Sequence, residues 1–306
     1  MTNLKKLGLT ALAGSLVATT GYAGSLDISG AAKVSYASGD TTETSGNPWS
    51  MTRDITFSGS GEMDNGMTIS YFQLLSAGAF SSSGLTLDMG DAGTATFMNG
   101  ASGGHGIGAY DDKMPNAAEQ VWDDLDGQEN GVVTFNSANT FGYGTSFAGV
   151  NVSANYNKQT DGGSAKSFAA DFSPMDGAMI FVAMSDEYSG SNSTTDQVTF
   201  GGTYTTGPVT AGIQRSNIDV TAVNGDADRT HIAASFQVNE DLAIAYGMST
   251  VEFENATLTD QEDSGFSASY TVGSMSLTAA FNSQDNAGGA NGTDDEHKEI
   301  GLAFAF

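Results

Sequence analysis

The chain has 306 residues, with 36 Asp and Glu against 10 Lys and Arg, and therefore a formal net charge of −26. This acidity argues against nucleic acid and anionic membrane surfaces as partners. It has no cysteine, which excludes a disulfide framework and a thiol nucleophile. Forty glycines would suggest disorder by a simple count, but seventeen Phe and ten Tyr recur along the chain and indicate a folded protein.

The first 23 residues have the pattern of a secretory signal peptide. Lys5 and Lys6 supply a positive start, residues 7–18 are an apolar run, and residues 21–23 offer a small-residue cleavage site. The run is too short to span a bilayer as a helix, so export explains it better than a membrane anchor or a buried helix. We therefore expect residues 1–23 to be removed and one domain to span residues 24–306.

Nearly every later segment alternates apolar and polar residues with a period of two, which is the strand pattern. Val150, Val152, Ala154 and Tyr156, for example, alternate with asparagines and a serine. The pattern predicts sixteen strands, at 26–37, 51–62, 67–77, 84–89, 94–98, 131–141, 146–157, 164–173, 178–188, 196–206, 209–220, 228–238, 242–253, 264–272, 275–283 and 297–306.

The connections between these strands alternate between two kinds. Turn sequences such as MDNG at 63–66 and PMDG at 174–177 predict tight reversals at one end of the hairpins. Longer polar and acidic stretches follow at the other end. The longest covers residues 99–130, and a connection of that length in a compact domain is usually functional or disordered.

Apolar/polar alternation fits either a soluble sandwich with a dry core or a membrane barrel with a wet lumen. An even number of strands, connections that are short on one side and long on the other, and a uniformly polar second face favour the barrel. About sixteen strands are enough to leave an aqueous channel. We predict an all-β fold, a 16-stranded antiparallel transmembrane β-barrel.

Four stretches of the mature chain carry a resemblance to a known family. They are LDISGAAKVSYAS at 26–38, RDITFSGSGEMDNGMTISYFQ at 53–73, GVVTFNSANTFGYGTSFAGVNVSANYN at 131–157, and the terminal IGLAFAF. With these segments the chain resembles the general porins of the Gram-negative outer membrane along its whole mature length. The last two segments are the more specific. The resemblance implies that Phe304 and Phe306 belong to the terminal signal read by the outer-membrane assembly machinery.

In that family the long loop after the fifth strand folds into the barrel and narrows the pore. Its carboxylates face a cluster of arginines across the constriction. The resemblance implies an inward-folded long third loop here and a constriction role for Asp111, Asp112, Glu119, Asp123, Asp124, Asp126 and Glu129.

The opposing side departs from the family pattern. Asp54 stands where porins commonly carry an arginine, and Arg53, one place off, has lipid-facing parity, so that it would snorkel near the rim. The basic candidates for the pore lining are Lys33 and Arg229 on the wall and Lys113 in the loop. A full arginine ladder is therefore not expected, and the acids should dominate.

The expected function is passive diffusion of small hydrophilic solutes and ions, with a preference for cations because carboxylates favour them. A substrate-selective channel, with Tyr110 and Trp122 as a binding track, is one alternative. A structural or adhesive surface barrel is another, and in that case the loop acids would only be solvated. The resemblance further implies a homotrimer in outer-membrane lipid, reached by export through the periplasm.

No enzymatic activity is expected. The glycine-rich run at 103–108 lacks the Lys-Ser/Thr and the βαβ context of a phosphate loop. Calcium is the one cofactor considered, because it takes oxygen ligands and Asp124, Asp126 and Glu129 are close in sequence. Trp122 stands where the leading Asp of an EF-hand loop would be, so a diffuse counterion cloud remains the alternative.

Overall fold

The computed structural model describes residues 26–39, 46–101, 104–127, 131–132, 138–158, 162–189, 193–222 and 225–306. The expected signal peptide lies outside these ranges, and so does Glu129. Over the part of the chain that is described, no helix is long and apolar enough to cross a membrane.

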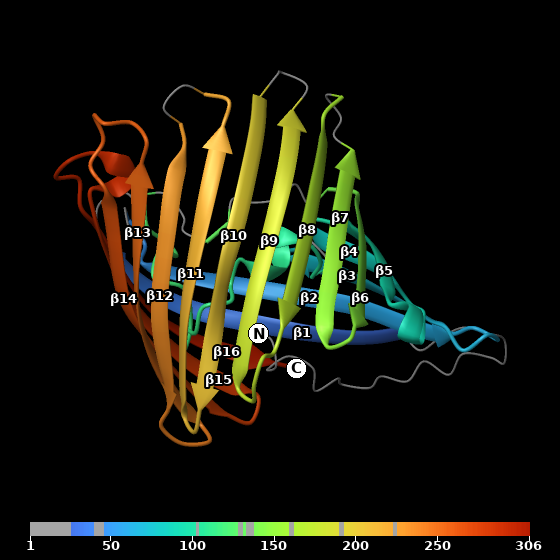
Figure 1. Cartoon of the computed structure of the whole chain (residues 1–306). Helices are drawn as coiled ribbons and strands as arrows, with labels where there is room; N and C mark the ends of the chain where they lie inside the picture. The colour runs from blue at the N-terminus through green and yellow to red at the C-terminus, as the bar shows by residue number, and fades with distance from the viewer. Residues whose placement is uncertain are drawn as a thin grey trace.

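The described residues form sixteen antiparallel strands that close into a barrel, with β1 paired to β16 (Figure 1). The first half comprises β1 (Leu26–Gly39), β2 (Trp49–Glu62), β3 (Thr68–Ser76), β4 (Ala79–Asp88), β5 (Thr94–Asn99), β6 (Thr140–Phe147), β7 (Val150–Lys158) and β8 (Ser164–Phe172). The second half comprises β9 (Ala178–Ser189), β10 (Ser193–Thr206), β11 (Val209–Val220), β12 (Ala227–Gln237), β13 (Leu242–Phe253), β14 (Gln261–Val272), β15 (Met275–Asp285) and β16 (Asp295–Ala305). The prediction of a 16-stranded antiparallel barrel is confirmed.

The barrel is apolar outside and polar inside. On β9 the outward side chains of Ile180, Val182 and Met184 are 44–49% exposed, whereas the inward Phe181 and Ala183 are buried. Elsewhere the inward positions are mostly Ser, Thr, Asn and Gln. This inversion suits a wall with lipid on one side and water on the other, because a closed barrel leaves no unpaired strand edge in the hydrocarbon.

Two-residue turns explain where the predicted strands were misplaced. The predicted strand at 131–141 is wrong at residues 131–132 and 138–139, which are bends and turns, and right only at Thr140 and Phe141, where β6 begins. The chain reverses at Ala148 and Gly149, with φ of 51° and 83°, as a type I′ turn requires. Ala-Gly is not the usual sequence signal for that turn, so the turn was not predicted.

The same turn occurs between β3 and β4. Ala77 and Gly78 have φ of 52° and 84°, and β4 begins at Ala79 rather than at residue 84. This hairpin lies at the end of the barrel that also carries the long connection between β5 and β6. The predicted alternation of short and long connections therefore does not hold for every hairpin.

Candidate functional site

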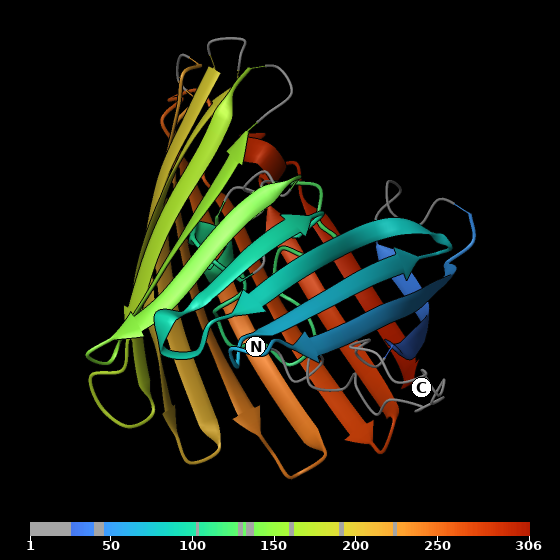
Figure 2. The same ribbon diagram turned by 90° about the vertical axis from the view of Figure 1, so that its right-hand side faces the viewer.

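The connection between β5 and β6 is described at residues 100–101, 104–127, 131–132 and 138–139, and its segment 104–127 runs through the inside of the barrel (Figure 2). Its backbone amides donate hydrogen bonds to inward-facing side chains of the wall. These are Gly106 to Ser153 Oγ (2.9 Å), Ile107 to Ser167 Oγ (3.2 Å), Ala117 to Ser267 Oγ (3.1 Å) and Asp126 to Asp295 Oδ2 (2.7 Å). A buried loop needs partners for its backbone polar groups, and here the polar wall supplies them.

Glycines of the wall make room for this loop. A Cβ added at Gly142 or Gly144 of β6 would lie 2.7 Å from the His105 ring, and one at Gly247 would lie 2.7 Å from Val121 Cγ1. Both glycines of β6 fall between the predicted strands at 131–141 and 146–157, but they lie within a strand and mark a close approach of the loop. Glycine at an inward position of a strand is the sequence signal that was missed.

We call residues 104–110 the neutral end of the loop. They include the 3₁₀ turn η2 (Ile107–Tyr110) and lie against the wall from β6 to β9. Ile107 is fully buried, and the Tyr110 ring stacks on Phe181 with centroids 4.9 Å apart. The Tyr110 hydroxyl donates a hydrogen bond to Asp171 Oδ2 at 2.5 Å.

The titratable groups of the neutral end stay uncharged at neutral pH. Burial lowers the pKa of the His105 imidazole. Burial also raises the pKa of the Tyr110 hydroxyl, and its hydrogen bond to the Asp171 carboxylate adds to the rise. This end is thus fixed by apolar packing, by backbone amide hydrogen bonds to serine hydroxyls and by the hydrogen bond from Tyr110 to Asp171.

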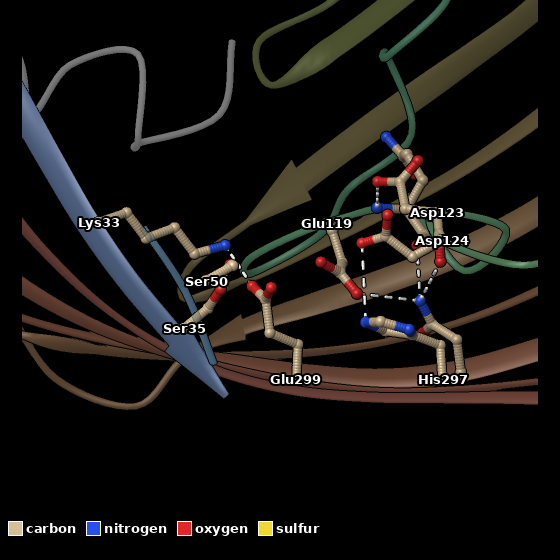
Figure 3. Close-up of polar contacts among 10 residues, drawn as sticks. Lys33, Ser35, Ser50, Glu119, Asp123, Asp124, His297 and Glu299 are labelled. Atoms are coloured by element: carbon tan, nitrogen blue, oxygen red, sulfur yellow. Dashed lines mark hydrogen bonds and ion pairs between the residues drawn. The ribbon is translucent and has the colours of Figure 1, made fainter. Parts of the chain in front are cut away.

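We call residues 119–126 the acidic end. Asn282 on β15 donates hydrogen bonds from Nδ2 to Glu119 Oε1 (3.1 Å) and to the carbonyl oxygens of Gln120 and Asp123 (both 3.2 Å). Figure 3 shows Glu119, Asp123 and Asp124 gathered beside His297 and Glu299 of β16. His297 Nε2 and Asp124 Oδ2 are 3.7 Å apart.

Negative charge accumulates at the acidic end. Burial raises the pKa of the Glu119 carboxyl to about 8. The carboxylates of Asp123, Asp124 and Glu299 add to that rise, and Lys33 opposes it. Lys33 forms an ion pair with Glu299, so one cation faces several carboxyl groups.

The other predicted loop acids have different positions. Asp111 accepts a hydrogen bond from the amide of Val132 at 3.1 Å, and this bond joins two parts of the same loop. The side chains of Asp112 and Asp126 are exposed. Glu129 lies outside the described residues. Among the described residues, the structure therefore brings Glu119, Asp123 and Asp124 together.

The predicted basic and opposing residues are also scattered. Arg229 on β12 is buried at an inward position, and the Lys113 ammonium lies 5.3 Å from the centre of the Tyr110 ring. Asp54 on β2 points inward with a buried Oδ1 that has no hydrogen-bond partner among the described residues, whereas Arg53 points outward. Of the predicted bases, Lys33 is the one whose charge is placed at the acidic end.

The two aromatic residues proposed for a binding track are largely buried, although Tyr110 borders an open cavity of about 610 Å³ that His105, Ser153 and Asp171 also line. Tyr110 is 5% exposed and Trp122 is 6% exposed. The Trp122 ring packs edge-on against the buried His231 of β12, with centroids 4.4 Å apart. Both rings therefore hold the loop against the wall.

The chain end closes the barrel seam. Gly30 and Phe306 exchange backbone hydrogen bonds of 2.7 and 2.9 Å. The rings of Phe304 and Phe306 are 44% and 59% exposed on the outer surface. A Cβ at Gly30 would lie 2.5 Å from the edge of the Phe306 ring, so the absence of a side chain at Gly30 lets the ring lie close to β1.

Among the described residues, one group of side chains is arranged to hold a metal ion. It consists of Asp124, His297 and Glu299, whose ligand atoms lie within 4.8 Å of one another. It shares only Asp124 with the predicted calcium set, and Asp126 is not part of it.

Comparisons with known proteins agree with this architecture. A family model described as Gram-negative porin matches residues 8–306. No curated protein sequence matches the chain. Among similar solved structures, a porin refined at 1.8 Å has 13% sequence identity and a TM-score of 0.70, covering 92% of this chain and 100% of that chain. The anion-selective porin from Comamonas acidovorans has 14% identity and a TM-score of 0.69, covering 92% of this chain and 99% of that chain. In-vitro folded OmpT, an outer membrane protein of Vibrio cholerae, has 11% identity and a TM-score of 0.69, covering 95% of this chain and 100% of that chain.

Proposed function

Because the chain belongs to the Gram-negative porin family, we propose that its outer-membrane channel passes small hydrophilic solutes by passive diffusion and prefers cations. The observation that carries the proposal is the acidic end of a loop inside the barrel. A ring or cluster of carboxylates at a narrowing attracts cations and repels anions. No catalytic residue is needed for such a function.

The charge balance inside the barrel supports the preference for cations. Glu119, Asp123, Asp124 and Glu299 gather at one place, and Lys33 is the cation whose charge acts on them. Several other bases point outward, where Lys166, Arg215 and Lys298 pair with acids of the outer surface. They contribute little to the field in the lumen.

The fold by itself does not decide the sign of the selectivity. A structure with a TM-score of 0.69 to this chain is described as an anion-selective porin. Barrels of one architecture can therefore differ in ion preference, and the residues at the constriction must set it. In this chain those residues are mainly acidic.

Reversal potentials in planar bilayers test the proposal. With a gradient of potassium chloride at pH 7 and low salt, we expect a potential that shows a higher permeability for potassium than for chloride. Triple replacement of Glu119, Asp123 and Asp124 by the corresponding amides should move the ratio toward one. Chloride preference in the unmodified protein would contradict the proposal.

Liposome swelling separates a diffusion channel from an adhesive surface barrel. Vesicles containing the folded protein should swell in small sugars and amino acids, because a water-filled pore admits them. An adhesin without an open pore would not produce swelling.

We also propose that the chain is exported to the periplasm, inserted with the help of its terminal Phe306, and assembled as a homotrimer. Family membership supports these three steps. Chemical crosslinking of the protein in isolated outer membranes should yield a species of three chains, and truncation of Phe306 should reduce its amount.

A further inference from the structure

We propose that Asp124, His297 and Glu299 form a binding site for one first-row divalent transition-metal ion, for which Zn²⁺ is the probe. Asp124 comes from the acidic end of the loop, and the other two residues come from β16 (Figure 3). The site would therefore join the loop to the wall. This inference concerns a ligand that passive diffusion does not require.

The geometry fits a metal ion with small adjustments. The candidate ligand atoms lie within 4.8 Å of one another, and the pair from His297 and Asp124 is 3.7 Å apart. Ligands bound to tetrahedral zinc at about 2.0–2.1 Å lie roughly 3.3 Å from one another. Because the Asp124 side chain is 60% exposed, it is free to close that difference and leaves room for a water ligand.

The donor types favour a transition metal over calcium. An imidazole nitrogen with two carboxylates suits Zn²⁺ and its neighbours in the first row, whereas calcium prefers six to eight oxygens. Asp124 and Asp126 alone would offer oxygens, but Asp126 is not part of the group that includes His297 and Glu299. The residues that the fold brings together thus indicate a different metal from the one that the sequence suggested.

The surroundings of the site favour a bound dication. Glu119 and Asp123 lie beside the three ligands, and Lys33 is the cation that pairs with this group through Glu299. Close carboxylates repel one another unless cations or protons compensate them. A carboxylate has two oxygens, so Glu299 can keep its ion pair with Lys33 and still bind the metal through the other oxygen.

A bound ion would also change conduction. It would add positive charge beside the acidic end and fix Asp124 to β16, so both the cation current and the preference for cations should fall. This consequence rests on the proposed function, but metal binding does not, so binding is measured separately.

Isothermal titration of the detergent-folded full chain with ZnCl₂ in excess Mg²⁺ tests the site. We expect one Zn²⁺ per chain and, by the preference of imidazole for such metals, an affinity that falls about tenfold or more in His297→Gln and in Asp124→Asn. Asp126→Asn is the matched control, since it removes the same charge from the same loop outside the site. Its affinity should stay near that of the unmodified protein.

Spectroscopy and electrophysiology provide independent readouts. Pulsed electron paramagnetic resonance of the Cu²⁺-loaded protein should show coupling to one imidazole nitrogen, lost in His297→Gln but kept in His105→Gln. In bilayers, Zn²⁺ should reduce the current reversibly, and EDTA should restore it. Heat-modifiable migration in gels and metal-free conductance verify that each variant is folded.

Three results would overturn the site: no Zn²⁺ binding by the unmodified protein, unchanged binding in folded His297→Gln, or an equal loss of affinity in Asp126→Asn and Asp124→Asn. The last would show that a diffuse acidic field holds the ion. Zn²⁺ binding without any ion conduction would leave the site standing and contradict the channel.

Discussion

The two ends of the inner loop are held against the barrel wall by different forces. At the neutral end, residues 104–110, Ile107 is fully buried and Tyr110 stacks on Phe181. At the acidic end, residues 119–126, carboxyl groups gather near β15 and β16, where Asn282 holds the backbone. Aromatic packing attaches both ends, through Tyr110 at one and Trp122 at the other, but only the acidic end also gathers unfavourable charge.

This difference teaches how a channel can combine a fixed constriction with an ion filter. Apolar burial depends little on salt and pH, so the buried Ile107 and the stacked Tyr110 ring let the neutral end act as the anchor. Carboxylates gathered at one place repel one another and so weaken the docking of the acidic end, but they also create the electric field that selects ions. We therefore expect changes at the neutral end to affect stability and changes at the acidic end to affect selectivity.

The largest effect is expected when both ends are removed. Deletion of residues 104–127 takes away the segment inside the barrel, and the single-channel conductance should rise severalfold because the narrowing is lost. Single-channel recording beside the unmodified protein measures this. An unchanged conductance would place the loop outside the conducting path.

Truncation of the anchor should have the next largest effect. Ile107→Ala leaves a cavity at a fully buried site and should lower the stability of the docked loop by about 2–5 kcal/mol. Amide hydrogen exchange around residue 107 and open-channel noise should both increase. Ile213→Ala is the control, because Ile213 is 52% exposed on the outer face and touches no part of the loop anchor.

Loss of one hydrogen bond at the neutral end should have a smaller effect. Tyr110→Phe removes a hydroxyl that donates to the Asp171 carboxylate, and hydrogen bonds to charged groups contribute about 1.5–3 kcal/mol. Denaturant unfolding should show the loss, while the reversal potential should not change. A large shift in ion preference would contradict the division between the two ends.

The smallest effect concerns proton binding at the acidic end. The pKa of Glu119 rises from 4.5 to about 8, so the folded state favours the protonated form, and docking should weaken as the pH rises from 4.5 toward 8. Ionised Glu119 adds negative charge, so the permeability ratio of potassium to chloride should rise modestly between pH 7 and 9. Reversal potentials in EDTA should show this rise, and Glu119→Gln should lack it.

Much of the architecture was predictable because strand alternation is a local property. Segments such as 209–220 and 242–253 were predicted with the bounds that the structure has. The region after the loop was predicted wrongly because Gly142 and Gly144 look like turn residues in sequence. Their actual role depends on His105, which lies more than thirty residues away along the chain and reaches them only in the folded barrel.

The acids of the loop show the same division. The sequence located them in one long connection and predicted their excess over bases, since composition and connection length can be read directly. It did not indicate that Asp111 would form a hydrogen bond within the loop or that Asp112 and Asp126 would be exposed. Nor did it indicate that Asp124 would lie beside His297.

By itself, then, the sequence determined the sixteen-strand barrel, its polar interior and its acidic inner loop. Alternation with a period of two follows from the order of residues, and the excess of acids follows from composition. Only the tertiary structure decided which carboxyl groups share a site and which end of the loop anchors it. Those relations depend on closure of the barrel, which brings β16 and residues 119–126 together although more than 150 positions separate them in the chain.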